Sequence, residues 1–137
     1  MELLGGAAFH RLENAIQASA MRHRVISNNI ANNDTPYFKR SDVVFEELLA
    51  QAIGSQAGGA LAGRLTDARH IPINGAYPSP SPRVATDEST AFNHNGNNVD
   101  IEKEMAMLAE NHLRYNLLSQ QVSHEVKMLR IGIKGVV

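Results

Sequence analysis

The sequence predicts an all-α protein whose long N- and C-terminal helices pair as a coiled-coil-like hairpin around an irregular, partly extended middle segment. Two observations predict this fold. Apolar side chains recur in alternating steps of three and four residues near both chain ends, and four of the five prolines fall between these two regions. We therefore expect an N-terminal helix over residues 1–33, a middle segment over 34–97 and a C-terminal helix over 98–137.

The two stripes have the spacing of heptad seams. The N-terminal stripe is formed by Phe9, Leu12, Ile16, Ser19, His23, Ile26 and Ile30. The C-terminal stripe is formed by Ile101, Met105, Leu108, His112, Tyr115, Ser119, Val122, Val126, Leu129 and Ile133. Asp100 is expected to cap the second helix, and Gly132 and Gly135 to end it. Seams at both chain ends predict that the two helices pack antiparallel.

The middle segment has weaker signals. Ser41 and Asp42 predict the start of a short helix near residues 41–53, which Gly54 would stop. The proline-rich stretch 70–92 suits only extended or β-like structure, and Asn95-Gly96 predicts a tight turn before the last helix. So long a weakly structured segment indicates that neighbouring subunits complete the core.

The stretch "SNNIANNDTP" at residues 27–36 crowds asparagines at the end of the first helix. Asn32, Asn33 and Asp34 are expected to end this helix, because their side chains compete for backbone hydrogen bonds. The pair Asn28-Asn29 lies one turn earlier, where no terminator is needed. Two readings are open for this pair: buried, hydrogen-bonded amides that fix the helix register, or a frayed helix end in water.

Composition excludes several classes of protein. The net charge of −1 and the lack of a basic run argue against nucleic-acid binding. No apolar run approaches the roughly 18 residues of a membrane span, so direct membrane insertion is not expected. Glu2 and the lack of a sustained apolar core near it predict that the chain carries no cleavable signal peptide.

Catalytic and metal-binding patterns are also lacking. The sequence has no cysteine, and "HEVKM" at residues 124–128 has methionine where a zinc-protease helix needs its second histidine. His112 and His124 are too far apart on one helix to share an ion. We therefore expect no enzyme activity and no cofactor, and we expect His23 and His112 to form hydrogen bonds across the helix seam.

Two stretches resemble the flagellar axial proteins, the family of rod, hook and hook-associated subunits. "ISNNIANNDTPYFKR" at residues 26–40 is similar to the family signature S-x-N-[IL]-A-N-x-x-T, although Tyr37 stands where many relatives carry glycine. "NGNNVDIEKEMAMLAENHLRYNLLSQQVSHEVKMLRIGIKG" at residues 95–135 resembles the C-terminal helix of the proximal-rod subunits. The matching positions are Asn95, Gly96, Asn97, Val99, Asp100, Glu104, Ala109, Asn111 and Tyr115, and "RHIPI" at 69–73 resembles their middle segment.

This resemblance implies a structural subunit of the proximal rod of the flagellar basal body, in the periplasm, that polymerises through its terminal helices and joins the membrane-embedded MS ring to the rest of the rod. The implied partners are other copies of the chain, rod proteins of the FlgC, FlgF and FlgG types, FliE, the MS-ring protein FliF and the flagellar type III export apparatus. Export through that apparatus would leave the N-terminus uncleaved.

The predicted assembly interface comprises Phe9, Leu12, Ile16, Ile26, Asn29, Ile30, Asn32, Ile101, Met105, Leu108, His112, Tyr115, Val122, Val126 and Leu129. Two alternatives fit the same composition. One is another short rod subunit of the FlgC type, and the other is a soluble helical-hairpin adaptor or chaperone.

Overall fold

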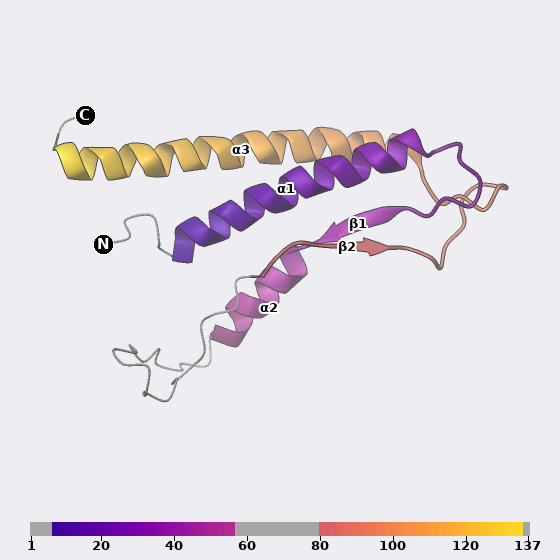
Figure 1. Ribbon diagram of the computed structural model, residues 1–137, viewed down its shortest axis with the longest axis horizontal. Coiled ribbons are helices and arrows are strands. Elements are labelled where there is room, and N and C mark those ends of the chain that lie inside the picture. Colours follow the sequence, from indigo (N-terminus) through magenta and orange to yellow (C-terminus); the bar gives the residue numbers. More distant parts are fainter. Residues whose placement is uncertain (1–6, 57–79, 136–137) are drawn as a thin grey trace.

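The computed structural model describes residues 7–56 and 80–135, and within them the chain is mainly helical. Helix α1 (Ala7–Ala31) and helix α3 (Ile101–Lys134) pack against each other in antiparallel directions. Figure 1 shows that they lie close together where α1 ends and α3 begins, and that they separate toward the start of α1. The predicted all-α hairpin of terminal helices is confirmed.

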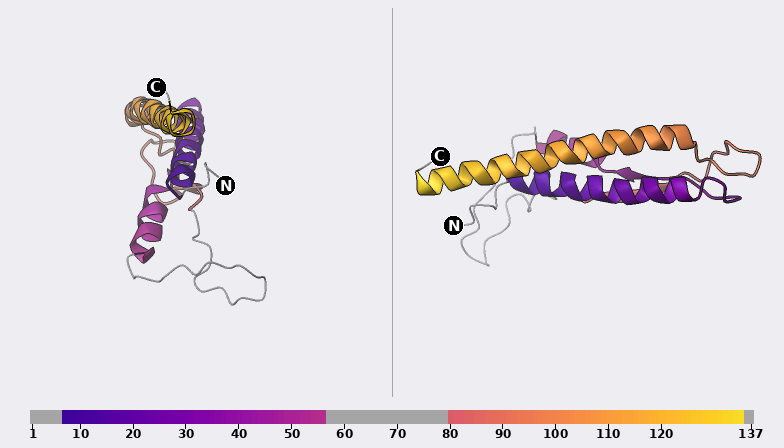
Figure 2. Two further views of the ribbon diagram at one scale, coloured as in Figure 1. Left: turned by 90° about the vertical axis from the view of Figure 1, so that its left-hand side faces the viewer. Right: turned by 90° about the horizontal axis from the view of Figure 1, so that it is seen from above.

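A small antiparallel sheet lies beside the hairpin. Strand β1 (Ser41–Val44) pairs with β2 (Arg83–Thr86), so that Ser41 faces Thr86 and Val44 faces Arg83. Helix α2 (Glu46–Gln56) follows β1 directly. Two strands alone are marginally stable in water. Packing of β1 against α1 therefore supports the sheet, with α2 projecting beyond it (Figure 1, Figure 2).

The short helix predicted near residues 41–53 is present as α2, but it begins and ends later than predicted. Residues 41–44 form a strand, because the β-branched pair Val43-Val44 suits extended backbone and β2 supplies the partner edge. The helix begins at Glu46, where the carbonyl of Phe45 accepts from the amide of Leu49 at 2.9 Å. It continues through Gly54 to Gln56.

The ends of the long helices agree better with the sequence. Asp100 caps α3, because its side chain accepts from the amides of Glu102 and Lys103. Gly135 ends α3 in the left-handed conformation with φ of 66°, whereas Gly132, the other predicted terminator, lies inside the helix. The predicted extended stretch 70–79 and "RHIPI" lie outside the described residues; the rest of the proline-rich stretch contains β2.

Tyr37 is the described non-glycine residue with a left-handed backbone, at φ of 60°. A residue with a β-carbon is strained in this conformation, which glycine adopts freely. The amide of Tyr37 donates to the carbonyl of Asn95 at 3.1 Å, and its ring lies against Gly96. The predicted turn at Asn95-Gly96 is present, with the amide of Gly96 bonded to the carbonyl of Asn93.

The apolar core is small and lies near the closed end of the hairpin. The buried apolar residues of the described chain are Ala18, Ile26, Val43, Phe45 and Val99. Buried polar residues are as prominent, namely Ser19, Asn29, Asn97, Asn98, Glu104 and Asn111. Buried polar groups must be hydrogen-bonded to be tolerated, so these six residues define the part of the molecule with the most specific geometry.

Candidate functional site

A buried carboxylate ties α3 to α1 and to the start of β1. Glu104, with 0% of its surface exposed, accepts from Arg40 Nε at 2.5 Å through Oε1 and from Asn29 Nδ2 at 3.1 Å through Oε2. Asn29 also exchanges hydrogen bonds with the backbone of Ser41, at 2.8 Å to its carbonyl and 3.1 Å from its amide. We call Asn29, Arg40, Ser41 and Glu104 the Glu104 cluster.

Arg40 supplies the charge that makes burial of Glu104 tolerable. Burial lowers the pKa of the Arg40 guanidinium, but hydrogen bonds with Glu104 and Asp42 outweigh that effect and raise the pKa above its ordinary value. The backbone amide of Arg40 donates to Asn98 Oδ1 at 2.6 Å. Among the described residues, no buried side-chain nitrogen or oxygen lacks a hydrogen-bond partner. The cluster is therefore a satisfied buried network, of the kind that specifies one packing arrangement.

The side chain of Asn97, in the segment before α3, binds the backbone that follows α1. Its Nδ2 donates to the carbonyls of Asn32, Asn33 and Thr35 at 2.8 to 3.0 Å, and its Oδ1 accepts from the amide of Val99 at 2.6 Å. These carbonyls belong to the turn that follows α1. Asn97 therefore ties this turn to the segment before α3, and the two fold as one unit.

The asparagines of the α1 terminus therefore have different roles. Asn29 is fully buried and hydrogen-bonded across the helix interface, which confirms the first of the two readings for that residue. Asn28 is exposed, as the second reading requires for a residue in water. Asn32 bonds back to the carbonyl of Asn28 at 2.8 Å and supports the turn that follows.

A second polar pair fixes the register of the two long helices. Ser19 Oγ donates to Asn111 Oδ1 at 3.0 Å, and Asn111 Nδ2 donates to the Ser19 carbonyl at 2.9 Å. Glu104 and Asn111 are one heptad apart on α3, so both point toward α1. A shift of either helix by one turn would leave these buried groups without partners.

An ion-pair network attaches α2 to the hairpin. Glu46 binds Arg22 Nη2 of α1 at 2.6 Å and Arg114 Nη1 of α3 at 2.7 Å. Burial raises the pKa of Glu46, but the hydrogen bond from Arg22 and the nearby arginine charges outweigh it and hold the pKa below its ordinary value. The network closes one side of the hairpin, where β1 and α2 lie.

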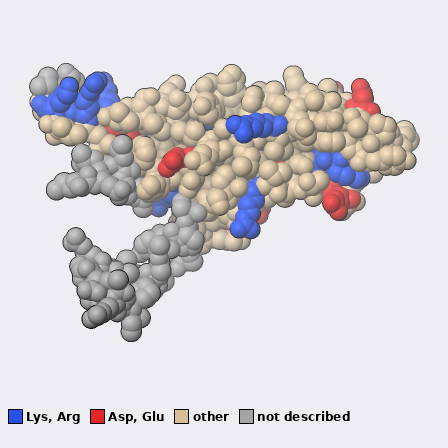
Figure 3. Space-filling model, in the orientation of Figure 1, with Lys and Arg blue, Asp and Glu red and all other residues tan. Residues whose placement is uncertain are grey.

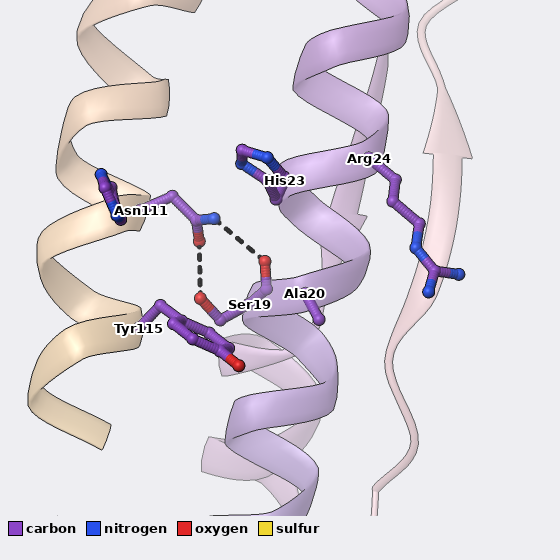
Figure 4. A pocket seen from close by; sticks show the side chains of 7 residues that line it. Ser19, Ala20, His23, Arg24, Asn111 and Tyr115 are labelled. Carbon is purple, nitrogen blue, oxygen red and sulfur yellow. Dashed lines mark hydrogen bonds between the residues drawn. The ribbon is translucent and has the colours of Figure 1, made fainter. Parts of the chain in front are cut away.

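The other side of the hairpin carries an open groove. It has a volume of about 340 Å³ and is lined by Ser19, Ala20, His23, Arg24, Asn111, His112 and Tyr115. Figure 4 shows the Ser19–Asn111 hydrogen bonds bridging the helices, with His23 and Tyr115 beside them and Arg24 directed away from α3. We refer to these seven residues as the open groove.

The structure distributes the predicted interface residues over three environments. Ile26 and Asn29 are buried within the chain. Half-buried are Phe9, Leu12, Ile16, Ile30, Asn32, Leu108, Val122 and Leu129, and exposed are Ile101, Met105, His112, Tyr115 and Val126. These positions stay predictions as contacts between subunits.

Two details of the seam prediction are wrong within one chain. Glu104 and Asn111, rather than Met105 and His112, are the buried residues of α3, because each finds a hydrogen-bonding partner on α1. The exposed His23 and His112 form no hydrogen bond with any residue in the described ranges, contrary to expectation. Both histidines lie in the open groove instead.

Sequence reasoning passed over Glu104, Asn97, Asn98, Asn111 and Arg40 as interface residues. A signal existed for Glu104 and Asn111, since polar residues one heptad apart beside an apolar stripe suit register-fixing contacts. Arg40 gave no signal, because its partner Glu104 is 64 residues away in the sequence.

The described residues form no metal-binding group and no membrane-spanning helix. No three histidine, aspartate or glutamate side chains within 7–56 and 80–135 lie close enough to hold a metal ion. None of the helices described is both long and apolar enough to span a membrane. What the geometry provides is a fixed hairpin with an uncovered face.

These features define a helical-hairpin structural protein whose buried contacts include Asn29, Glu104 and Asn111, three of the residues that carry the resemblance to the flagellar axial proteins. No family model matches the chain. It is 34% identical to the flagellar basal body rod protein FlgB of Bacillus subtilis over 98% of each chain. It is 36% identical to FlgB of Borreliella burgdorferi over 84% of this chain and 87% of that one, and 31% identical to FlgB of Salmonella typhimurium over 94% of both. The chain belongs to the FlgB family and is a structural subunit of the flagellar basal body rod.

Proposed function

We propose that this subunit polymerises through the uncovered faces of α1 and α3 and joins the MS ring to the rest of the rod. One observation carries the proposal: α3 exposes a series of large apolar side chains along its length. They include Ile101, Met105, Leu113, Tyr115, Leu117, Val126, Met128 and Ile133. Extended exposed apolar surface of this kind marks a protein interface.

The arrangement of charge supports the same proposal. Figure 3 shows a face of the hairpin on which uncharged side chains dominate, with a basic group at the far end of α3, charged side chains of both signs toward the opposite end and a few isolated charges between them. Lys127, Arg130 and Lys134 belong to the far end of α3. An interface core depleted of charge, with charge at its margin, is the usual anatomy of protein interfaces.

The proposed partners are those that the family resemblance implies: further copies of the chain, rod proteins of the FlgC, FlgF and FlgG types, FliE, FliF and the type III export apparatus. The proposed location is the periplasmic rod, reached without cleavage of a signal peptide. The proposed role is mechanical, with no enzyme activity. The FlgB relatives favour this role over the FlgC-type and adaptor alternatives.

Mass spectrometry of purified basal bodies tests the proposal. In a strain that carries this chain as its only FlgB-type subunit, we expect the protein in the basal-body fraction with its N-terminal residues retained. The same strain without the gene should yield no complete rods. Absence of the chain from purified basal bodies would contradict the structural role, and removal of some twenty N-terminal residues would contradict uncleaved export.

A further inference from the structure

The outer face of α3 carries an apolar ridge that no described part of the chain covers. Leu113 and Leu117 are 68% and 66% exposed and lie four residues apart, so they stand next to each other on the helix. Leu113 is two positions from Asn111, which points toward α1, so the ridge faces nearly the opposite way. We call Leu113 and Leu117 the α3 ridge.

The open groove is suited to an apolar occupant. The polar atoms at its floor are satisfied, since Ser19 and Asn111 bond to each other. No acidic side chain within residues 7–56 and 80–135 contributes to it, and its other lining comprises Ala20, His23, Arg24, His112 and Tyr115. Of these, His23, Arg24 and His112 are exposed at its edge. Apolar side chains could cover Ala20 and Tyr115 without breaking a hydrogen bond that the described residues make.

The groove is accessible because α2 and β1 occupy the other side of the hairpin. A separate hollow lined by Arg22, Val43, Glu46 and Arg114 lies on that side, where the ion pairs of Glu46 hold α2 in place. Residues of one helix face repeat every three or four positions. Ala20 and His23 therefore belong to a different face of α1 from Arg22.

Charge complementarity identifies a second copy of the chain as the occupant. Arg24 lines the outer edge of the groove with its side chain directed away from α3; it is exposed and has no ion pair with any residue the structure describes. Glu110 precedes Leu113 by three positions and Leu117 by seven, so it flanks the α3 ridge. Its largely exposed carboxylate is paired with Arg114 Nη2 of the same helix at 2.9 Å, a weak surface pair that can exchange partners. A ridge with its own acidic neighbour would thus meet a groove with an unpaired cation at its edge.

Resting on the proposed polymerisation, we propose that Leu113 and Leu117 of one copy insert into the open groove of a second copy, with Glu110 of the first beside Arg24 of the second. Ridge and groove lie on different faces of the same hairpin. The contact is therefore heterologous, and each copy that donates its ridge still offers its own groove. Such a contact repeats into a ring or a helical array.

Because the chain has no cysteine, introduced cysteines report this contact directly. Full-length Ala20→Cys and Leu117→Cys are purified separately, mixed at high concentration and oxidised. We expect a disulfide-linked heterodimer from the mixture and a ladder of oligomers from the Ala20→Cys/Leu117→Cys double variant. Glu47→Cys, exposed on α2, is the matched control and should give little product with Leu117→Cys. Equal yields from the two mixtures would overturn the inference.

A charge reversal supplies an independent check. Arg24→Glu should lower the yield of the Ala20–Leu117 product by about 1.5-fold to fivefold at low salt, the range expected for an exposed ion pair, and adding Glu110→Lys to the ridge-bearing partner should restore it. Circular dichroism should be unchanged, since both residues are exposed. An unaltered yield for Arg24→Glu would contradict the assigned orientation.

The same double variant in basal bodies separates this inference from the proposed function. A chain present in basal bodies without the Ala20–Leu117 cross-link would refute the contact and leave the structural role standing. A cross-link formed by purified protein, together with absence of the chain from basal bodies, would refute the role and support the contact.

Discussion

Replacing Glu104 by methionine should unfold much of the closed end of the hairpin, because it strands a buried charge. Glu104 has no exposed surface, and it accepts hydrogen bonds from Arg40 and Asn29. Removing one partner of a buried ion pair costs about 3 to 5 kcal/mol. Arg40 keeps Asp42 as a second partner at 3.0 Å, so we expect the lower end of that range.

A loss of about 3 kcal/mol lowers the folding equilibrium constant roughly a hundredfold. With so small an apolar core, that loss is a large fraction of the total stability. Urea titration of the full chain, followed by the helical circular dichroism signal, measures it. The double variant Arg40→Met/Glu104→Met removes both charges and should regain most of the lost stability, because no unpaired buried charge is left.

Glu102→Met is the matched control, since Glu102 is an exposed carboxylate in the same first turn of α3. Its loss should cost less than about 1 kcal/mol, through the helix dipole. If Glu104→Met unfolds at the urea concentration of the parent, the cluster is not what holds the helices together. A double variant no more stable than Glu104→Met would equally refute the argument from an unpaired charge.

Three further changes test other contacts. Asn97→Asp should destabilise the chain by about 3 kcal/mol or more in urea titrations, because a buried carboxylate would face three carbonyl oxygens. The control Asn95→Asp should cost under about 1 kcal/mol, and equal costs for the two variants would contradict the role of Asn97. Tyr37→Gly should raise the melting temperature by a few degrees by relieving the left-handed backbone, and a lower value would refute the strain. The pKa of Glu46 is lowered in the folded chain, so the stabilisation it supplies should be complete above its ordinary pKa of 4.5 and be lost as pH falls through its folded pKa. Arg22→Met should reduce this dependence of the melting temperature on acid pH, and an unchanged curve of melting temperature against pH would contradict the pairing.

The long helices were predictable because their signals are local. The apolar spacing, the Asp100 cap and the terminal Gly135 act within one or two turns, and the structure contains the corresponding helix ends. The break after Ala31 follows from the asparagine cluster for the same reason. Such features depend on neighbouring residues, so a single sequence contains the information that specifies them.

The strand at residues 41–44 was not predictable in the same way. It depends on pairing with residues 83–86 and on the two hydrogen bonds between the Ser41 backbone and the Asn29 side chain, one donated by each residue. Ser41-Asp42 is locally an acceptable helix start, and the distant partners decide against it. Long-range pairing thus overrides a local cap signal.

The buried polar contacts were predictable only in part. Asn29 could be expected to face an interface, since an amide in a seam fixes register. Its partner Glu104 and the contribution of Arg40 depend on the tertiary fold, because a glutamate in the first turn of a helix is ordinarily read as a surface residue. The seam prediction therefore placed apolar neighbours where the structure has a carboxylate.

The most direct test of the central claim, that the subunit assembles through its terminal helices, is a paired measurement on Ile30→Asp and Leu108→Asp. Both residues are half-buried on the predicted seam, and a charge buried there in the assembled rod would cost several kcal/mol in every copy. Secreted protein is quantified beside basal bodies counted by electron microscopy, with Gln51→Asp on α2 as the exposed control. We expect normal secretion without basal bodies for both seam variants and normal numbers of both for the control. Normal basal-body counts in Ile30→Asp and Leu108→Asp would contradict the account.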